Sequence, residues 1–422
     1  MKNSLAVYFS GFLAVSAALS AMASDWPQWR GPQRNGLSQE TGLLKEWPKE
    51  GPKLLWQVKD IGSGYSTPAV VGERIYVLGN EGLENEFVQA LAVRDGKRVW
   101  QTRLGKVGNP DQQPKFPAAR STPTADGELL YALASDGDLA CVETATGKVR
   151  WQKSLRADFG GKPGTWAYSE SPLIDGDVLV CTPGGTEATL VALNKKTGEV
   201  IWKSAVPGGD EAAYSSALIV TTDGIKQYVQ HLAKGLVGVE AKTGKFLWRY
   251  DKAVSKFNAN IPTPVTRDGC IYTAGAGTGG GVVKLKANNG AVEAEPVHFS
   301  PKLPTAIGGA VLLGDHLYGT GGSGMLCAEF TTGSVKWEDR ALGAASLCHA
   351  DGRLYLHAES GDAALVEPTP EGYKEKGRFT PPDQPKRANQ MEKAWAYPVV
   401  ANGRLYLRDH GSLWCYDVKT AN

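Results

Sequence analysis

The chain has 422 residues, of which 51 are Gly and 12 are Trp, whereas Phe occurs 10 times. Its 46 Lys and Arg residues nearly balance 44 Asp and Glu residues, which argues against nucleic-acid binding through bulk positive charge. Hydrophobic residues make up 42% of the chain, enough to bury a core, so a fully disordered chain is excluded. The excess of Gly and Trp therefore calls for a structural explanation.

The first 23 residues have the pattern of a signal peptide. An apolar run from Leu5 to Leu19 follows Lys2, and Ala21-Met22-Ala23 fits a cleavage site of small residues. The run is short for a membrane-spanning helix, and no Cys lies nearby to accept a lipid. We therefore expect a signal peptide over residues 1–23 and an exported protein, periplasmic or extracellular. It would have no lipid anchor and no transmembrane segment after signal removal.

Short strands that end in Trp recur along the rest of the chain. Successive Trp residues are 44, 51, 51, 46 and 89 residues apart, at Trp56, Trp100, Trp151, Trp202, Trp248 and Trp337. The last interval corresponds to two periods, and the missing Trp position is assigned to Ala294. Gly lies four residues before most of these Trp positions, where it suits a hairpin turn with positive φ. The sequence thus predicts repeated β-hairpins that each end in a Trp.

A second pattern of strand, turn and strand lies between the Trp positions. It occurs eight times, starting at Thr67, Thr122, Ser171, Ser216, Thr263, Gly309, Leu347 and Tyr397. Each copy is followed by a short alternating strand and then by the next outer strand, which gives four antiparallel strands per repeat. Four strands recurring every 40–50 residues or so are typical of a β-propeller blade. Two separate β-domains are the alternative, but the steady period disfavours them.

The two ends of the chain are predicted to share one blade. The last copy, residues 397–417, supplies three strands, and residues 52–58 form a strand that precedes the first copy. Pairing them would complete an eighth blade and remove the open sheet edges of a linear array. We therefore predict an all-β, eight-bladed propeller of four-stranded antiparallel blades over residues 53–422. Residues 24–52 would be an N-terminal extension that packs on it.

The six Cys residues raise the question of disulfides in an exported protein. Cys141, Cys327 and Cys415 occupy equivalent positions in their repeats, where other repeats have Ala192 and Gly238. The pattern favours small buried side chains over disulfide bridges. The Cys and His residues also lack the spacing of a zinc site, so no metal site is predicted.

The repeats, such as Ala145-Thr146-Gly147-Lys148-Val149-Arg150-Trp151, resemble the tryptophan-docking repeats of quinoprotein propellers. The segment from Asp25 to Gly36, DWPQWRGPQRNG, resembles the start of bacterial PQQ-binding-like β-propeller repeat proteins. One branch of this superfamily implies a dehydrogenase that holds pyrroloquinoline quinone (PQQ) and calcium on the axis beside a pair of adjacent Cys. Another branch, the outer-membrane assembly propellers, implies partner binding without a cofactor. This sequence has neither an adjacent Cys pair nor a Cys for lipid attachment.

The loops that enter the inner strands converge around the axis of such a propeller, and they carry the candidate site residues. Arg120 and Glu170, on adjacent blades, are either ligands of an anionic or calcium-linked quinone or a structural ion pair, and Asn260 is a further oxygen donor. Aromatic rings on the same loops could stack on a planar ring or a sugar, or pack the rim. The candidate cofactor-binding residues are Arg120, Glu170, Asn260, Tyr65, Tyr214 and Trp395; Asn258, Trp166 and His231 lie in the same region.

The function predicted from these features is a binding scaffold of the cell envelope, a monomer that holds a protein partner, a small molecule or a saccharide. A PQQ- and calcium-dependent alcohol or sugar dehydrogenase with an atypical axial site is the alternative. Saccharide binding or processing by the aromatic rim is a third hypothesis. A binding role is favoured over an enzymatic one, and no catalytic residue, cofactor or nucleic-acid partner is assigned.

Overall fold

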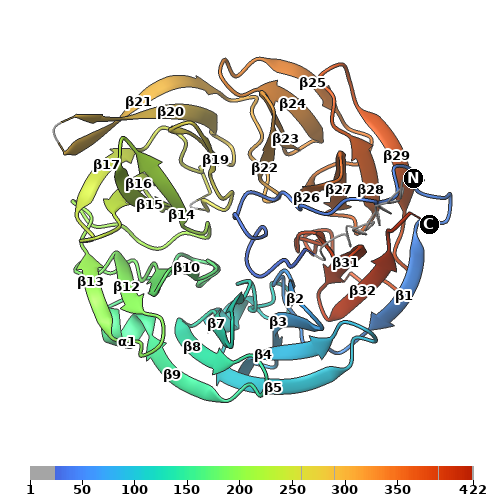
Figure 1. Cartoon of the computed structure of the whole chain (residues 1–422), viewed down its shortest axis with the longest axis horizontal. Helices are drawn as coiled ribbons and strands as arrows, with labels where there is room; N and C mark the ends of the chain where they lie inside the picture. The colour runs from blue at the N-terminus through green and yellow to red at the C-terminus, as the bar shows by residue number, and fades with distance from the viewer. Residues whose placement is uncertain (1–23, 258, 289, 388, 421–422) are drawn as a thin grey trace, which may run out of the picture.

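The computed structural model describes residues 24–257, 259–288, 290–387 and 389–420, and these residues form a closed ring of β-sheets around a central axis (Figure 1). Each of the eight sheets has four antiparallel strands, as predicted for an eight-bladed propeller. The strands of blades one to four, in order from the axis outward, are β2 (Ala69–Val71), β3 (Arg74–Glu81), β4 (Asn85–Ala92) and β5 (Arg98–Gly105); β6 (Thr124–Asp126), β7 (Leu129–Leu133), β8 (Asp138–Glu143) and β9 (Val149–Ser154); β10 (Leu173–Asp175), β11 (Val178–Cys181), β12 (Leu190–Asn194) and β13 (Val200–Ser204); β14 (Leu218–Thr222), β15 (Ile225–Leu232), β16 (Gly235–Glu240) and β17 (Phe246–Tyr250).

Blades five to eight continue around the ring in the same order. Their strands are β18 (Val265–Arg267), β19 (Cys270–Gly275), β20 (Gly279–Asn288) and β21 (Ala291–Ser300); β22 (Ala310–Leu313), β23 (His316–Thr320), β24 (Met325–Glu329) and β25 (Val335–Asp339); β26 (Ala345–Ala350), β27 (Arg353–Ala358), β28 (Ala363–Glu367) and β29 (Lys374–Phe379); β30 (Val399–Ala401), β31 (Arg404–Asp409), β32 (Ser412–Asp417) and β1 (Lys53–Val58).

Blade eight joins the two ends of the chain. Strand β1 pairs antiparallel with β32 from Lys53 opposite Asp417 to Val58 opposite Leu413. In Figure 1 the blue β1 lies beside the red β32. The predicted closure of the ring is confirmed, and it leaves the outer edge of β32 paired instead of exposed.

Outer-strand Trp residues dock most blades onto the next. The indole Nε1 of Trp100 donates a hydrogen bond to the Thr144 carbonyl of the next blade over 2.9 Å, and Trp151 does the same to Lys195 over 3.0 Å. The ring of Trp100 lies against Gly147, where an added Cβ would be 2.5 Å from ring atom Cε3. The turn residue must be Gly because φ is +72° and a ring covers its α-carbon.

Blades four, five and seven depart from this pattern. In blade four the indole Nε1 of Trp248 donates to the Gln227 side chain of the same blade over 2.7 Å. His298, and not Ala294 as the sequence analysis predicted, occupies the docking position of blade five opposite Val282. Its Nε2 lies 2.8 Å from the Phe330 carbonyl of blade six. Ala294 lies opposite Leu285, further along the strand. The prediction was wrong because β20 and β21 have 10 residues each, which shifts the Trp spacing.

In blade seven the equivalent position, opposite Leu365, is Gly377, and Trp47 from the N-terminal segment lies against that glycine. Trp47 makes edge contacts with Tyr355 at 5.8 Å and Phe379 at 5.3 Å between ring centroids. A Trp from a segment before the first repeat thus takes the place of the missing one.

All six Cys residues are free thiols, and five of them are buried. Cys141, Cys327 and Cys415 lie opposite the docking residues Trp151, Trp337 and Trp56, as Ala192 lies opposite Trp202. A small side chain is needed there because an indole occupies the neighbouring space. The interpretation of these Cys as buried small residues is confirmed.

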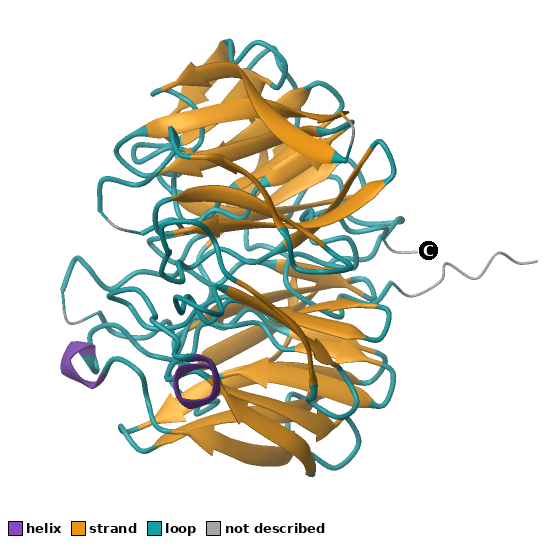
Figure 2. Cartoon of the chain, turned by 90° about the vertical axis from the view of Figure 1, so that its left-hand side faces the viewer, coloured by secondary structure: helices purple, strands orange, loops and turns teal. Residues whose placement is uncertain are grey.

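The loops between blades lie on one face of the ring. They contain the short helices η1 (Pro110–Gln112) and α1 (Leu155–Phe159), shown in purple in Figure 2, and the C-terminus lies on the opposite side. Within the described part of the chain, no helix has the length and apolar character needed to cross a membrane.

Candidate functional site

An N-terminal segment, residues 24–47, runs across the middle of the ring before β1 begins (Figure 1). Its backbone pairs with blade one between Trp26 and Val70, and with blade seven between Leu37 and His349. The Ser38 hydroxyl donates to the Val400 carbonyl of blade eight over 3.0 Å. The segment therefore ties together blades seven, eight and one, which are neighbours where the ring closes.

Two buried arginines fix this segment. Arg34 donates to the carbonyls of Ser171 and Pro172 in blade three over 2.8 and 3.1 Å, and Arg30 donates to the Ala310 carbonyl of blade six over 2.5 Å. Burial lowers the pKa of Arg34 to about 10, because the guanidinium loses its hydration. Carbonyl groups on opposite sides of the axis thus hold the segment in place.

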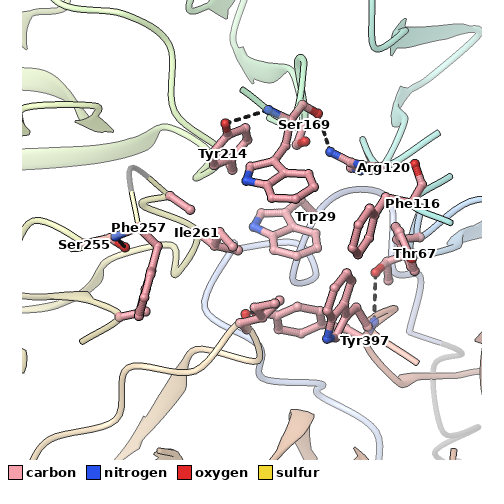
Figure 3. A pocket seen from close by; sticks show the side chains of 16 residues that line it. Trp29, Thr67, Phe116, Arg120, Ser169, Tyr214, Ser255, Phe257, Ile261 and Tyr397 are labelled. Atoms are coloured by element: carbon pink, nitrogen blue, oxygen red, sulfur yellow. Dashed lines mark hydrogen bonds between the residues drawn. The ribbon is translucent and has the colours of Figure 1, made fainter. Parts of the chain in front are cut away.

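A cavity of about 320 Å³ lies at the axis, between this segment and the inter-blade loops. Figure 3 shows Trp29 among the lining side chains, between Tyr214 and Tyr397. Most of the lining is aromatic or aliphatic. The complete set is Trp29, Tyr65, Thr67, Phe116, Arg120, Trp166, Ser169, Tyr214, Ser255, Phe257, Ala259, Ile261, Ala276, Ile307, Trp395 and Tyr397.

The aromatic side chains of this axial pocket support one another. Trp29 meets Tyr397 edge to face at 4.6 Å, and Phe116 meets Trp166 in the same way at 4.9 Å. Phe116 is also parallel to Trp395 within 3°, with 6.4 Å between the ring centroids. Such contacts restrict the rings, so the pocket is preformed and loses little conformational entropy on binding.

Four of the six predicted site residues, Tyr65, Arg120, Tyr214 and Trp395, line the axial pocket. Arg120 holds its loop together: its Nε donates to the Pro117 carbonyl over 3.1 Å, and its Nη1 donates to the Trp166 carbonyl. Its guanidinium also lies 5.9 Å from the centre of the Tyr65 ring. Burial lowers the pKa of Arg120. The Tyr214 hydroxyl accepts a hydrogen bond from the Trp166 amide over 2.9 Å.

Glu170 does not line the pocket, and it forms no ion pair with Arg120 among the interactions of the described residues. Its carboxylate accepts hydrogen bonds from the Thr182 amide, from the Thr182 hydroxyl at 2.7 Å and from Gln230 at 3.0 Å. Burial raises the pKa of Glu170 to about 7, and hydrogen bonds from Thr182 oppose that rise. The hypothesis of an Arg120–Glu170 ion pair at the axis is wrong, because Thr182 of blade three and Gln230 of blade four bind the carboxylate.

Asn260 also turns away from the axial pocket. Its Oδ1 accepts a hydrogen bond from the Ser255 amide over 2.7 Å, and its Nδ2 donates to the Leu232 carbonyl over 2.7 Å. The side chain therefore orders a loop. His231 is buried, 3.1 Å from the Thr273 hydroxyl, and burial lowers its pKa to about 3. Asn258 lies outside the described residues.

Sequence reasoning did not pick out Trp29, Phe116, Phe257 and Tyr397 as pocket residues. Phe116 and Phe257 are in entry loops, and Tyr397 opens the last copy, so their aromatic character on converging loops was the available signal. Trp29 gave no periodic signal, because it precedes the repeats. Its position follows from the three-dimensional path of the N-terminal segment.

The pocket residues do not fit a calcium-linked quinone. None of the lining side chains is a carboxylate, and the Asn260 oxygen is already hydrogen-bonded. Over the described residues, no group of three or more His, Cys, Asp or Glu side chains could hold a metal ion. Calcium prefers six to eight oxygen ligands with carboxylates among them.

The family model described as "Outer membrane protein assembly factor BamB" matches residues 34–187 and 167–369. These matches cover most of the chain, so it belongs to this family of PQQ-type β-propellers. The match begins inside the N-terminal segment and runs into blade seven.

Individual relatives are more distant. The outer membrane protein assembly factor BamB of Shewanella oneidensis is 24% identical over 280 residues, which cover 63% of this chain and 65% of that protein. The quinoprotein alcohol dehydrogenase PedH of Pseudomonas putida is 26% identical over 242 residues, which cover 56% of this chain and 35% of that one. The chain thus spans less than two thirds of the length of either curated relative. The crystal structure of BamB from Moraxella catarrhalis has a TM-score of 0.60 at 15% identity, covering 87% of this chain and 98% of that one. That similarity concerns the fold.

Proposed function

We propose that this chain is an exported scaffold of the cell envelope that binds a protein partner by taking an apolar side chain of that partner into the axial pocket. The observation that carries this proposal is the preformed aromatic cavity of about 320 Å³ at the centre of one face. Pockets of this size with convergent aromatic walls are typical ligand and anchor-residue sites. The family membership and the predicted signal peptide support a place in the envelope.

The surroundings of the pocket suit a protein partner. Phe257 lines the pocket and is 69% exposed, so its ring is available to a contacting surface. The loops around the pocket come from blades on all sides of the ring, which makes a broad platform around a central anchor site. Interfaces of proteins commonly have this arrangement of a buried anchor surrounded by weaker contacts.

A site-specific crosslinking experiment tests the proposal. A photoreactive amino acid replaces Phe257 in the exported protein, and the envelope of the native host is irradiated. We expect one specific crosslinked protein whose yield falls at least about tenfold with the additional variants Trp395→Ala or Phe116→Ala, because each removes a pocket wall. The matched control places the same photoreactive group at Val149, which is exposed on the outer strand β9. A crosslink that the pocket variants leave unchanged would contradict the proposal.

Two other functions have weaker support. The match to a quinoprotein alcohol dehydrogenase favours a dehydrogenase only through the shared fold. The residues that line the pocket do not supply the calcium ligands of such an enzyme. Aromatic walls are also used in saccharide binding, but few polar groups line this pocket. Titration with PQQ and calcium, followed by quinone absorbance, and titration with a panel of sugars, followed by Trp fluorescence, distinguish these functions from protein binding.

A further inference from the structure

The Glu40 carboxylate is a buried acceptor in the second half of the N-terminal segment. Glu40 is only 9% exposed. Its carboxylate accepts hydrogen bonds from the backbone amides of Asn402 at 2.8 Å and Gly403 at 2.9 Å. Both amides belong to the turn between β30 and β31 of blade eight. A third hydrogen bond comes from the backbone nitrogen of Ser24 at 2.9 Å.

Glu40 has no cationic partner within 4 Å among the described residues, whereas two other buried carboxylates have one. Asp210 pairs with Arg249 at 3.0 Å, and Asp409 pairs with Arg387 at 2.6 Å. Burying an ionised carboxylate is costly unless a cation or several hydrogen bonds compensate it. The group that approaches Glu40 where a cation would lie is the nitrogen of Ser24.

Ser24 is also the residue that would begin the mature chain after cleavage at Ala21-Met22-Ala23. We propose that Glu40 is the receptor for a new N-terminus formed by proteolysis between Ala23 and Ser24. A peptidase of the export machinery adds water across the Ala23–Ser24 bond. The bond between the Ala23 carbonyl carbon and the Ser24 nitrogen breaks. Ala23 keeps the new carboxylate, and the new amine of Ser24 takes up a proton. Its backbone amide becomes an ammonium group with three donors, one of which keeps the contact with Glu40 Oε1.

The resulting ion pair would hold the N-terminal segment against the ring. The Asp25 carboxylate accepts the Gly72 amide of blade one at 2.9 Å, and Trp26 pairs with Val70 of the same blade. Glu40 is bound to blade eight. An ammonium on Ser24 therefore connects blades one and eight through charge, five residues before Trp29, which lines the axial pocket. Processing of the chain and anchoring of the pocket wall are then one event.

The first test identifies the N-terminus and needs no variant. Mass spectrometry of the protein purified from the envelope of an exporting host should find Ser24 as the first residue. A mature chain that begins at any other residue overturns the proposal, because its amine could not occupy the position of the Ser24 nitrogen.

The second test measures the ion pair itself. A fusion is cut by a protease that leaves Ser24 as the first residue, and half of the product is acetylated at the α-amine only. Acetylation keeps one N–H donor but removes the charge. We expect acetylation to lower Tm by several degrees, since one buried ion pair is lost. In the variant Glu40→Gln the effect of acetylation should disappear, whereas in the control Glu46→Gln, at an exposed carboxylate, it should persist. An equal effect in all three proteins, or none in the parent chain, overturns the proposal. If Glu40→Gln does not fold, the comparison of free and acetylated parent chains still decides.

Discussion

The indole Nε1 of Trp29 donates a hydrogen bond to the hydroxyl of Thr263 over 2.8 Å, although 234 residues separate them in the chain. Thr263 lies directly before the innermost strand of blade five. The bond fixes the orientation of a ring that lines the axial pocket, while Tyr397 packs against the ring from another blade. The pocket wall thus depends on contacts between the first residues of the described chain and distant blades.

Replacing Trp29 tests this dependence. Trp29→Ala should lower the free energy of unfolding by about 3 kcal/mol, because a large packed ring and its hydrogen bond are lost. Trp29→Phe should cost about 1 kcal/mol, since it removes the hydrogen bond but keeps a ring. Urea unfolding followed by circular dichroism measures both. Equal costs for the two variants would show that the ring contacts contribute little.

Docking between blades one and two depends on the absence of a side chain at Gly147. In chemical unfolding, Gly147→Ala should lower the free energy of unfolding by about 2 kcal/mol more than Gly127→Ala does. Both glycines have positive φ, of +72° and +60°, but an added Cβ meets the Trp100 ring at Gly147 and nothing within 4 Å at Gly127. The strain of the backbone is therefore shared, and the difference isolates the overlap with the ring. Similar costs would contradict the role given to Trp docking.

These docking contacts show how far sequence reasoning reaches. The spacing of Trp and turn Gly predicted eight blades and the shared last blade, because both patterns are local and repeat in every blade. The longer hairpin of blade five broke that spacing and hid His298. The axial pocket was found in part: residues on converging entry loops could be predicted, such as Tyr65 and Trp395. Trp29 could not, since its place depends on a non-repeating segment that crosses the ring.

The same limit explains the error at Glu170. The sequence places Glu170 and Arg120 at equivalent loop positions on adjacent blades, which suggested a pair. The backbone instead aims Glu170 at Thr182 within its own blade. Competition between nearby hydrogen-bond donors is a matter of side-chain geometry, and no periodic pattern reports it.

Glu86 should make the stability of the protein depend on pH. Its buried carboxylate is hydrogen-bonded by the amide and hydroxyl of Ser135, and burial raises its pKa to about 7 against these bonds. Between roughly pH 4.5 and 7 the folded state binds more protons than the unfolded state, so stability falls as pH rises through this window. In Glu86→Gln, this pH-dependent fall in the free energy of unfolding, which amounts to up to about 3 kcal/mol, should be absent.

The measurement is urea unfolding at intervals from pH 4.5 to 8 for the parent chain and for Glu86→Gln. Glu73→Gln, at an exposed carboxylate in the turn between β2 and β3, is the matched control. Parallel pH profiles for the parent chain and Glu86→Gln would show that Glu86 titrates as it does in the unfolded chain.

Arg408 connects the last blade with the first. Its fully buried guanidinium donates to the carbonyls of Ser66 at 2.8 Å, Leu78 at 2.7 Å and Gly62 at 3.1 Å, and burial lowers its pKa to about 9. Arg408→Lys keeps the charge but cannot reach several carbonyls, so it should cost about 2–4 kcal/mol. Thermal unfolding measures the loss. The control Arg94→Lys, on a side chain that is 81% exposed, should be neutral, and a neutral Arg408→Lys would contradict the assigned role.

The thiols should differ in reactivity. Burial raises the pKa of Cys141 to about 11 and that of Cys415 to about 12, so both are protonated and covered at pH 8. Cys270 is the partly exposed member of the six. A disulfide reagent at pH 8 should therefore modify one thiol quickly in the folded protein and all six after denaturation. Cys270→Ser should abolish the fast reaction; a fast phase that survives it would assign the reactivity to another Cys.

The pairing of β1 with β32 has a consequence for the order of assembly. A chain synthesised from its N-terminus presents Trp29, Trp47 and β1 first, yet the strand that pairs with β1 ends at Asp417. The earliest residues must therefore wait for the latest ones before they find their final contacts. The axial pocket, whose lining includes Trp395 and Tyr397, can form only when the last blade is available, so the ability to bind requires a nearly complete ring.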